Sequence, residues 1–290
     1  MALSKELRDR ILAYQKNEIT GHHIYKNLAQ RLAHTSNGEV LEKIAADEAR
    51  HYKEWRTYTE QEVAPDRFHI WMYTLISRVF GFTFAIKLME RGEEVAQEDY
   101  QQLVGQIPEV EAILKDEDAH EAMLIDLLDE ERLRYAGSMV LGLNDALVEL
   151  TGTLAGLTLA LQDTRLIALS GSITGIAAAF SMAASEYLST KSEKTAKDPI
   201  KASIYTGAAY IMTVLVLILP YLIFENYYVC LGLTLTSAIL IIAFFNYYIS
   251  VAKDEPFKER FLEMAGLSLS VAVLSFFVGY AIRAFLGIDV

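Results

Sequence analysis

EKIAADEARH, from Glu42 to His51, is matched at the same offsets by EAILKDEDAH, from Glu111 to His120. Each copy ends in a Glu-x-x-His step. Residues three apart lie on one face of a helix, so the carboxylate and the imidazole of each copy can reach the same metal ion. One such step is weak evidence, because it is common as a solvated charge pair on helix surfaces. Two steps in matched registers predict a metal site that faces the inside of a helical bundle.

The repeat extends upstream to a single glutamate in each half. Glu18 precedes Tyr25 by seven residues, and Glu93 precedes Tyr100 by the same interval. Four-helix bundles with two-metal carboxylate sites take a lone Glu from each of two helices and a Glu-x-x-His step from each of the other two. The sequence therefore predicts two helical hairpins that pack to close one site with pseudo-twofold symmetry.

Other polar side chains of the same predicted helices can support this site. Glu90 lies one turn before Glu93 and Glu94 directly follows it. At least two of these three acids can line the site, and the repeat favours Glu93. Tyr25 and Tyr100 are expected to pack in the bundle and to hydrogen-bond a ligand.

The pattern resembles the rubrerythrin branch of the ferritin-like superfamily over about residues 4–134. The resemblance implies a four-helix bundle with a di-iron centre and with Glu90 near it. The implied ligands are Glu18, Glu48, His51, Glu93, Glu117 and His120. Rubrerythrins proper also carry an iron centre held by four cysteines, whereas this chain has only Cys230, which excludes electron transfer through such a centre. One cysteine also forms no disulfide framework, which fits a reducing compartment for the bundle.

Composition separates an acidic domain, residues 1–135, from an apolar domain, residues 136–290. The acidic domain holds 17 Lys and Arg against 26 Asp and Glu, so it carries −9 of the total charge of −12. An acidic surface attracts cations and disfavours nucleic acid. The opening MALSKELRDR lacks the apolar core of a signal peptide, so the acidic domain is expected to stay in the cytoplasm.

Five stretches after Tyr135 are long and apolar enough to cross a bilayer, which takes about 20 residues. They are residues 138–161, 166–190, 202–224, 227–250 and 261–285. Lys and Arg gather before the first stretch and in KSEKTAKDPIK and VAKDEPFKER, whereas the other connectors hold only Arg165. By the positive-inside rule, the N-terminus is cytoplasmic and the C-terminus lies outside or inside an organelle lumen. A plasma or inner membrane is the expected location. The expected fold is all-α, with a ferritin-like four-helix bundle followed by a five-helix transmembrane domain.

A sixth apolar stretch, FHIWMYTLISRVFGFTFAI at residues 68–86, falls inside the acidic domain. If it crossed the membrane, the bilayer would separate the two Glu-x-x-His steps, and the metal site could not form. The stretch is therefore interpreted as a crossover and the start of the third bundle helix. Trp71 and its neighbours are expected in the bundle core, at a dimer contact or against the membrane surface.

Charged residues inside membrane spans are costly and usually mark a pathway. The first span carries Asp145 and Glu149, and the second carries Met182 and Glu186, four residues apart in each case. Glycine and alanine crowd both spans, which permits close helix approach. The alternative is that the acids lie near the span ends and reach water, with the glycines serving packing alone. A thioether beside carboxylates suits a borderline transition metal better than Mg²⁺ or Ca²⁺, which favours a metal pathway.

Residues 136–290 resemble the vacuolar iron transporter family, through NDALVELTGTLAG in the first span and SMAASEYLS in the second. The resemblance implies a homodimer that moves Fe²⁺ or Mn²⁺ out of the cytoplasm in exchange for protons. It implies Asp145 and Met182 as pore ligands, with Glu149 and Glu186 as acidic neighbours. Two features depart from the family. Ala146 replaces the usual glycine, and the Glu-rich metal-collecting insert between the second and third spans is reduced to TKSEKTAKDPIKA.

Together the two domains resemble the membrane-bound ferritin group, which suggests that the bundle replaces the insert as metal collector. The expected function is proton-coupled iron export, with iron ions, protons, the lipid bilayer and a second copy of the chain as partners. No P-loop is present, which agrees with secondary transport. One alternative is a membrane-tethered di-iron ferroxidase or peroxide-consuming oxidase, so enzymatic activity in the bundle stays open. A second is a sensor that gates the pore. An anchor needs one span and no intramembrane acids, which favours the transporter.

Overall fold

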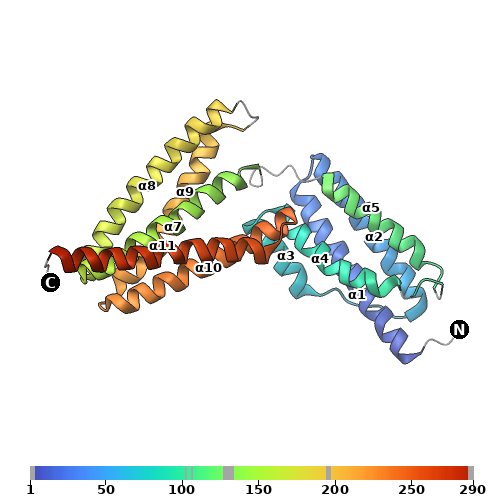
Figure 1. The fold of residues 1–290 in the computed structure, drawn as a ribbon. Coiled ribbons are helices and arrows are strands. Elements are labelled where there is room, and N and C mark those ends of the chain that lie inside the picture. The colour runs from blue at the N-terminus through green and yellow to red at the C-terminus, as the bar shows by residue number, and fades with distance from the viewer. Residues whose placement is uncertain (1–3, 102, 106, 127–133, 194–196, 287–290) are drawn as a thin grey trace. The chain divides into compact units, whose positions relative to one another are not determined.

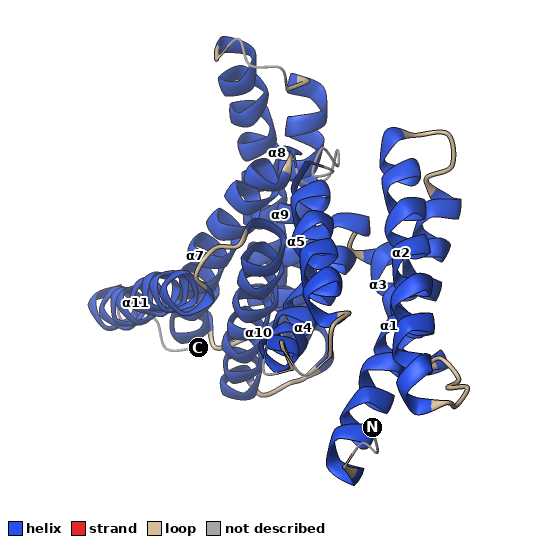
Figure 2. Ribbon diagram, turned by 90° about the vertical axis from the view of Figure 1, so that its right-hand side faces the viewer, coloured by secondary structure: helices blue, strands red, loops and turns tan. Residues whose placement is uncertain are grey.

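The computed structural model describes residues 4–101, 103–105, 107–126, 134–193 and 197–286, with the backbone alone for residues 93–99, 101, 121, 125, 126 and 286. All regular secondary structure in these ranges is helical (Figure 1, Figure 2), which confirms the all-α prediction. The chain divides into two compact units, Met1–Glu130 and Glu131–Val290, which we call the N-terminal unit and the C-terminal unit.

The N-terminal unit has five helices among its described residues. They are α1 (Lys5–Arg31), α2 (Ser36–Thr59), α3 (Arg67–Val79), α4 (Phe82–Gln101) and α5 (Val110–Asp126). α1 and α2 pack along each other as a hairpin (Figure 1). Side-chain caps define where both begin. Ser4 Oγ accepts a hydrogen bond from the amide of Leu7 at 3.2 Å, and Thr35 Oγ1 accepts one from the amide of Gly38 at 3.1 Å. These caps satisfy amide groups that the first helical turn leaves unpaired.

Two apolar clusters build the core of the N-terminal unit, and a polar layer separates them. Along α1, Ile11 belongs to one cluster and Ile24 to the other, with Glu18 midway between them. On α2 and α5, too, the predicted ligands lie between a residue of one cluster and a residue of the other. Apolar packing on both sides therefore holds the polar layer in place and limits the access of water to it.

The apolar stretch at residues 68–86 is not one continuous helix. α3 ends at Val79 and α4 begins at Phe82, with Gly81 between them at a φ of 99°. This left-handed backbone suits glycine, which has no Cβ to clash. Neither helix is among those long and apolar enough to span a membrane, which agrees with the crossover interpretation. Trp71 is 59% exposed, which excludes the bundle core and leaves the other two predicted places, a dimer contact and the membrane surface.

The C-terminal unit has five described helices with the length and apolar composition to cross a membrane. They are α7 (Ala136–Leu161), α8 (Thr164–Ser192), α9 (Pro199–Ile223), α10 (Tyr227–Lys253) and α11 (Phe257–Leu286). Their ends lie within a few residues of the predicted spans. α7 contacts each of the other four helices, so the helix that carries Asp145 and Glu149 is the centre of this unit.

Glycines on α7 let its backbone approach two neighbouring helices. A Cβ at Gly142 would clash with the backbone carbonyl of Thr206 on α9. A Cβ at Gly156 would lie 3.0 Å from the backbone carbonyl oxygen of Ser275 on α11. Beside the first contact, Thr206 Oγ1 donates a hydrogen bond to the carbonyl of Ser138 at 2.9 Å. The small residues of this span therefore serve close packing, as the sequence predicts.

Candidate metal centre

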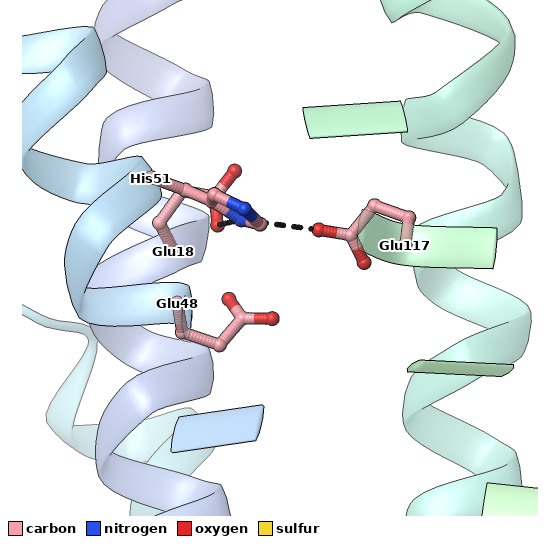
Figure 3. A group of neighbouring side chains, drawn as sticks. All are labelled: Glu18, Glu48, His51 and Glu117. Atoms are coloured by element: carbon pink, nitrogen blue, oxygen red, sulfur yellow. Dashed lines mark ion pairs between the residues drawn. The ribbon is translucent and has the colours of Figure 1, made fainter. Parts of the chain in front are cut away.

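Four buried side chains converge in the polar layer of the N-terminal unit. α1 supplies Glu18, α2 supplies Glu48 and His51, and α5 supplies Glu117. Figure 3 shows their polar ends gathered between the helices. One potential ligand atom from each lies within 4.8 Å of those from the other three, and none of the four residues is more than 7% exposed. Carboxylate oxygens and an imidazole nitrogen at this spacing can hold a divalent metal ion.

Two histidines turn their Nδ1 atoms toward these carboxylates. Nδ1 of His51 lies 3.4 Å from Oε2 of Glu18 and 3.3 Å from Oε1 of Glu117. Nδ1 of His120 lies 3.6 Å from Oε2 of Glu117 and 3.9 Å from Oε1 of Glu48. Both Nδ1 atoms are buried, and neither has hydrogen-bond geometry with any described residue. Two buried nitrogens without a hydrogen bond, aimed at three carboxylates, fit the donor set of a metal site.

The outer nitrogen of each imidazole is held by an aspartate from the facing helix. Nε2 of His51 lies 3.3 Å from Oδ2 of Asp116, and Nε2 of His120 lies 3.2 Å from Oδ2 of Asp47. Nη2 of Arg50 contacts both aspartates, each at 2.8 Å. A carboxylate on the outer nitrogen fixes the ring orientation and strengthens the imidazole as a ligand. Neither aspartate nor Arg50 was predicted, although an Asp directly precedes the Glu of both Glu-x-x-His steps.

Two aromatic side chains orient Glu18. Its Oε1 accepts hydrogen bonds from Nε1 of Trp55 and from the hydroxyl of Tyr100, both at 3.1 Å. Burial, followed by the charges of Glu18 and Glu117, raises the pKa of Tyr100 well above its usual value, so the hydroxyl remains a donor. Tyr100 thus makes the predicted hydrogen bond to a candidate ligand, while Tyr25 packs in an apolar cluster.

The acids of this site raise the pKa of both histidines. Burial would lower the pKa of His51, but its contacts with Glu117 and Glu18 and their negative charges raise it to about 11. Burial would likewise lower the pKa of His120, and Glu117 and Asp47 outweigh it. Burial would raise the pKa of Glu117, but its contacts with both imidazoles lower it to about 2. A proton on His51 therefore supplies positive charge beside these carboxylates.

Metal binding is expected to release protons, because an imidazole must lose its proton before it binds a metal ion. His51 is protonated at neutral pH, so an ion that binds it displaces about one proton, and affinity should rise about tenfold per pH unit near pH 7. The raised pKa also stabilises the metal-free fold fully below its ordinary value of 6.5, and this contribution is lost as the pH rises through about 11. Titration calorimetry with Mn²⁺ in two buffers of different ionisation enthalpy counts the protons. A count of zero would contradict the expectation.

A cavity of about 420 Å³ leads to the carboxylates. Its lining includes the buried Glu18, Glu48 and Glu117 together with the exposed Lys16 and His69. Because buried and exposed residues line the same space, the cavity connects the candidate ligands with the surface of the N-terminal unit. A hydrated cation or a small molecule can therefore reach them.

Gly21 makes room for the carboxylate of Glu48, since a Cβ at this position would lie 2.9 Å from Oε2 of Glu48. Gly21→Ala should displace that carboxylate and weaken Mn²⁺ binding by about tenfold, while alanine favours the helix itself. Gly92→Ala is the matched control, because a Cβ there would meet no atom within 4 Å. Dissociation constants and melting temperatures of both variants check the expectation, and equal affinities would argue against Glu48 as a ligand.

The structure describes the side chain of only one of the three acids predicted on α4. Glu90 is half-buried and does not belong to the group of four. The side chains of Glu93 and Glu94 lie outside the described residues, so their roles stay predictions.

The predicted pathway residues of the C-terminal unit pair with hydroxyl groups of neighbouring helices. Oε2 of Glu149 on α7 accepts a hydrogen bond from the hydroxyl of Tyr210 on α9 at 3.0 Å. Oε1 of Glu186 on α8 accepts one from Oγ of Ser138 on α7 at 2.5 Å. Neither hydroxyl group was predicted from the sequence. Tyr210 is one of several hydroxyl-bearing residues in its predicted span, so its position alone did not mark it as the partner of Glu149.

The other two predicted pathway residues do not meet these acids in a common ligand group. Asp145 is half-buried on α7, and Met182 packs against the apolar core of the C-terminal unit. Within the described part of one chain, the acids of the spans do not assemble into a group of three or more metal ligands.

A family model of the VIT family matches residues 136–198. The matched segment covers α7 and α8 and contains all four predicted pathway residues. Together with the five apolar helices, the match supports a VIT-type domain in an integral membrane protein, and this family implies transport of metal ions across membranes. No curated protein and no solved structure matches the chain.

Proposed function

We propose that the protein exports Fe²⁺, with Mn²⁺ as an alternative cargo, from the cytoplasm in exchange for protons, and that its N-terminal unit collects the metal. The VIT family match carries this proposal, because it falls on the two helices that hold the intramembrane acids. Five helices able to span a membrane also provide more than an anchor would need.

In the proposed pathway, Asp145 and Met182 bind the ion, and Glu149 and Glu186 are its acidic neighbours. A homodimer would gather these ligands from two copies, which agrees with the lack of a complete group among the described residues of one chain. Protonation of the carboxylates from the outside would weaken their hold on the metal, and deprotonation toward the cytoplasm would restore it. Such a site couples two cations without ATP.

The two hydroxyl groups beside the acids support this exchange. Tyr210 hydrogen-bonds one oxygen of Glu149, and Ser138 hydrogen-bonds one oxygen of Glu186. Each contact orients the carboxylate and leaves its second oxygen for an ion or a proton. The carboxylates would then meet the cargo in a defined orientation.

The N-terminal unit would act as a ferritin-like bundle with a di-iron centre. The buried group of Glu18, Glu48, His51 and Glu117 supports a metal site, and His120 adjoins it. The acidic charge of residues 1–135 would concentrate cations around the unit. The cavity would let them reach the ligands.

We place the N-terminal unit in the cytoplasm and the C-terminus outside. Lys and Arg gather before α7, around the junction of α8 with α9, and around the junction of α10 with α11, where they include the helix-end residues Lys253 and Lys258. The junctions on the opposite side hold only Arg165, in the first turn of α8. Positively charged connectors stay on the cytoplasmic side of a membrane.

A membrane-tethered di-iron ferroxidase or peroxide-consuming oxidase is the second candidate. The cavity of about 420 Å³ favours it, because it would admit O₂ or peroxide to the ligands. Bound iron would supply the redox chemistry, while Trp55 and Tyr100 hold Glu18 in position. This activity would belong to the N-terminal unit and would need no transport.

Fe²⁺ uptake into liposomes tests the proposal directly. The purified protein is reconstituted with a pH dye inside the vesicles, where only copies with the N-terminal unit outside respond. The native chain should take up Fe²⁺ while the internal pH rises, and Asp145→Ala should lose both signals. Glu225→Ala, in the connector between α9 and α10, should retain both. No uptake by the native chain in tight, correctly oriented vesicles would overturn export and favour the tethered oxidase.

A further inference from the structure

α3 carries an apolar stripe that the N-terminal unit leaves exposed. Phe68, Trp71 and Leu75 are 63%, 59% and 43% exposed. Intervals of three and four residues place them on one face of the helix. The ring centres of Phe68 and Trp71 lie 6.1 Å apart, so the two aromatic side chains form a continuous patch.

The opposite face of α3 is anchored in the bundle. Ile70 and Tyr73 pack against the apolar cluster that includes Ile24 of α1. The buried Ser77 accepts a hydrogen bond from Nη1 of Arg31 on α1 at 2.6 Å. α3 is thus held in place by its inner face, and the exposure of its outer face is a fixed property of the N-terminal unit.

The charge of α3 differs from that of the rest of its unit. It carries Arg67 and Arg78 and no Asp or Glu, whereas residues 1–135 have a net charge of −9. Arg67 precedes Trp71 by four residues and Arg78 follows it by seven, so both arginines flank the stripe on the same side of the helix. An anionic surface would repel most of the acidic unit and attract this helix.

Only a short connection joins the N-terminal unit to the first helix able to span a membrane. α5 ends at Asp126, and α7, the first helix able to span the bilayer, begins at Ala136. The nine residues between them reach at most about 30 Å when fully extended. The N-terminal unit is therefore tethered close to the bilayer surface, where even a weak contact is favoured by the high local concentration.

We propose that α3 docks on an anionic lipid surface, with its apolar stripe in the interfacial region and Arg67 and Arg78 at lipid phosphates. Aromatic and aliphatic side chains on one face with arginines beside them are typical of helices that lie in the membrane interface. Docking holds the N-terminal unit against the membrane whether or not the protein transports a metal, so the inference goes beyond the proposed function.

Trp71 is a natural reporter of this contact. The chain has two tryptophans, and the other one, Trp55, is fully buried in the bundle. Full-length protein is placed in nanodiscs of phosphatidylcholine and phosphatidylglycerol with brominated acyl chains. The emission of native protein minus that of Trp71→Phe isolates Trp71. Docking predicts a blue-shifted Trp71 emission that loses most of its intensity to bromines placed near the headgroups and that aqueous iodide does not reach.

Three outcomes would overturn the proposal. If iodide quenched Trp71 emission and brominated lipid did not, the stripe would lie in water. If neither quencher reached Trp71 and a bismaleimide cross-linked two Leu75→Cys chains, the stripe would contact a second copy of the chain instead of lipid. If brominated lipid quenched Arg67→Gln/Arg78→Gln and the matched Lys53→Gln control equally, the arginines would not bind anionic lipid at this contact. Docking predicts weaker quenching in the double arginine variant alone.

Discussion

Replacing Glu117 with glutamine is expected to weaken metal binding to the N-terminal unit by more than about 100-fold. Its two carboxylate oxygens lie 3.3 Å from Nδ1 of His51 and 3.6 Å from Nδ1 of His120, so both halves of the proposed site share this residue. Glutamine keeps the shape of the side chain and removes its charge. Loss of an outer partner of a metal ligand alone lowers affinity by roughly 10- to 100-fold, and loss of the ligand itself should exceed that. Mn²⁺ titration of the purified full-length protein measures the change.

Glu111→Gln is the matched control, because Glu111 is an exposed glutamate on the same helix. It should bind Mn²⁺ like the native protein. If Glu117→Gln bound Mn²⁺ with native affinity, Glu117 would not be a metal ligand. The same variant also separates the roles proposed for the bundle. A collector defect would lower Fe²⁺ uptake only at scarce iron, a gating defect would change the maximal rate, and a separate oxidase would leave transport unchanged.

Gly142→Ala is expected to destabilise the C-terminal unit by about 1–3 kcal/mol, a large effect for one methyl group. The added Cβ would clash with the backbone carbonyl of Thr206, and a backbone atom cannot turn away as a side chain can. Separating α7 from α9 would also stretch the hydrogen bond from Thr206 Oγ1 to the carbonyl of Ser138, now 2.9 Å long. Because α7 carries Asp145, Fe²⁺ uptake should fall together with the melting temperature in detergent.

Gly232→Ala, in the second turn of α10, adds the same methyl group where no atom lies within 4 Å. It should melt like the native protein and transport at the native rate. If Gly142→Ala also melted at the native temperature, α7 and α9 would not approach this closely in the folded protein.

Helical periodicity made much of the candidate centre predictable. A spacing of three residues places Glu48 and His51 on one face of α2, whatever surrounds them. The matching repeat then pointed to Glu117, and the structure brings all three together with Glu18. Asp47 and Asp116 were not predicted, because an acid next to another acid in a charged helix is also typical of a solvated surface. Their contact with the opposite helix becomes visible only when α2 and α5 face each other.

For the membrane helices, too, the sequence predicts some features and only the packing of the helices shows others. Length and apolar composition are sufficient to indicate five spans, since a bilayer sets both requirements. The pairing of Glu149 with Tyr210 depends on how α7 and α9 are rotated toward each other, and the close approach at Gly142 helps to set that rotation. Spacing within one helix carries no information on rotation between two helices.

The sequence by itself determined the all-helical fold, the five spans and the helix faces that carry the Glu-x-x-His steps, because these depend on local periodicity and composition. Only the tertiary structure decided that the polar layer lies between two apolar clusters and that two aspartates reach across to the opposite histidines. It also decided that Trp71 points outward, although the apolar stretch around it was compatible with the bundle core. These features depend on which helix faces meet, and that choice is made by the packing of the whole unit.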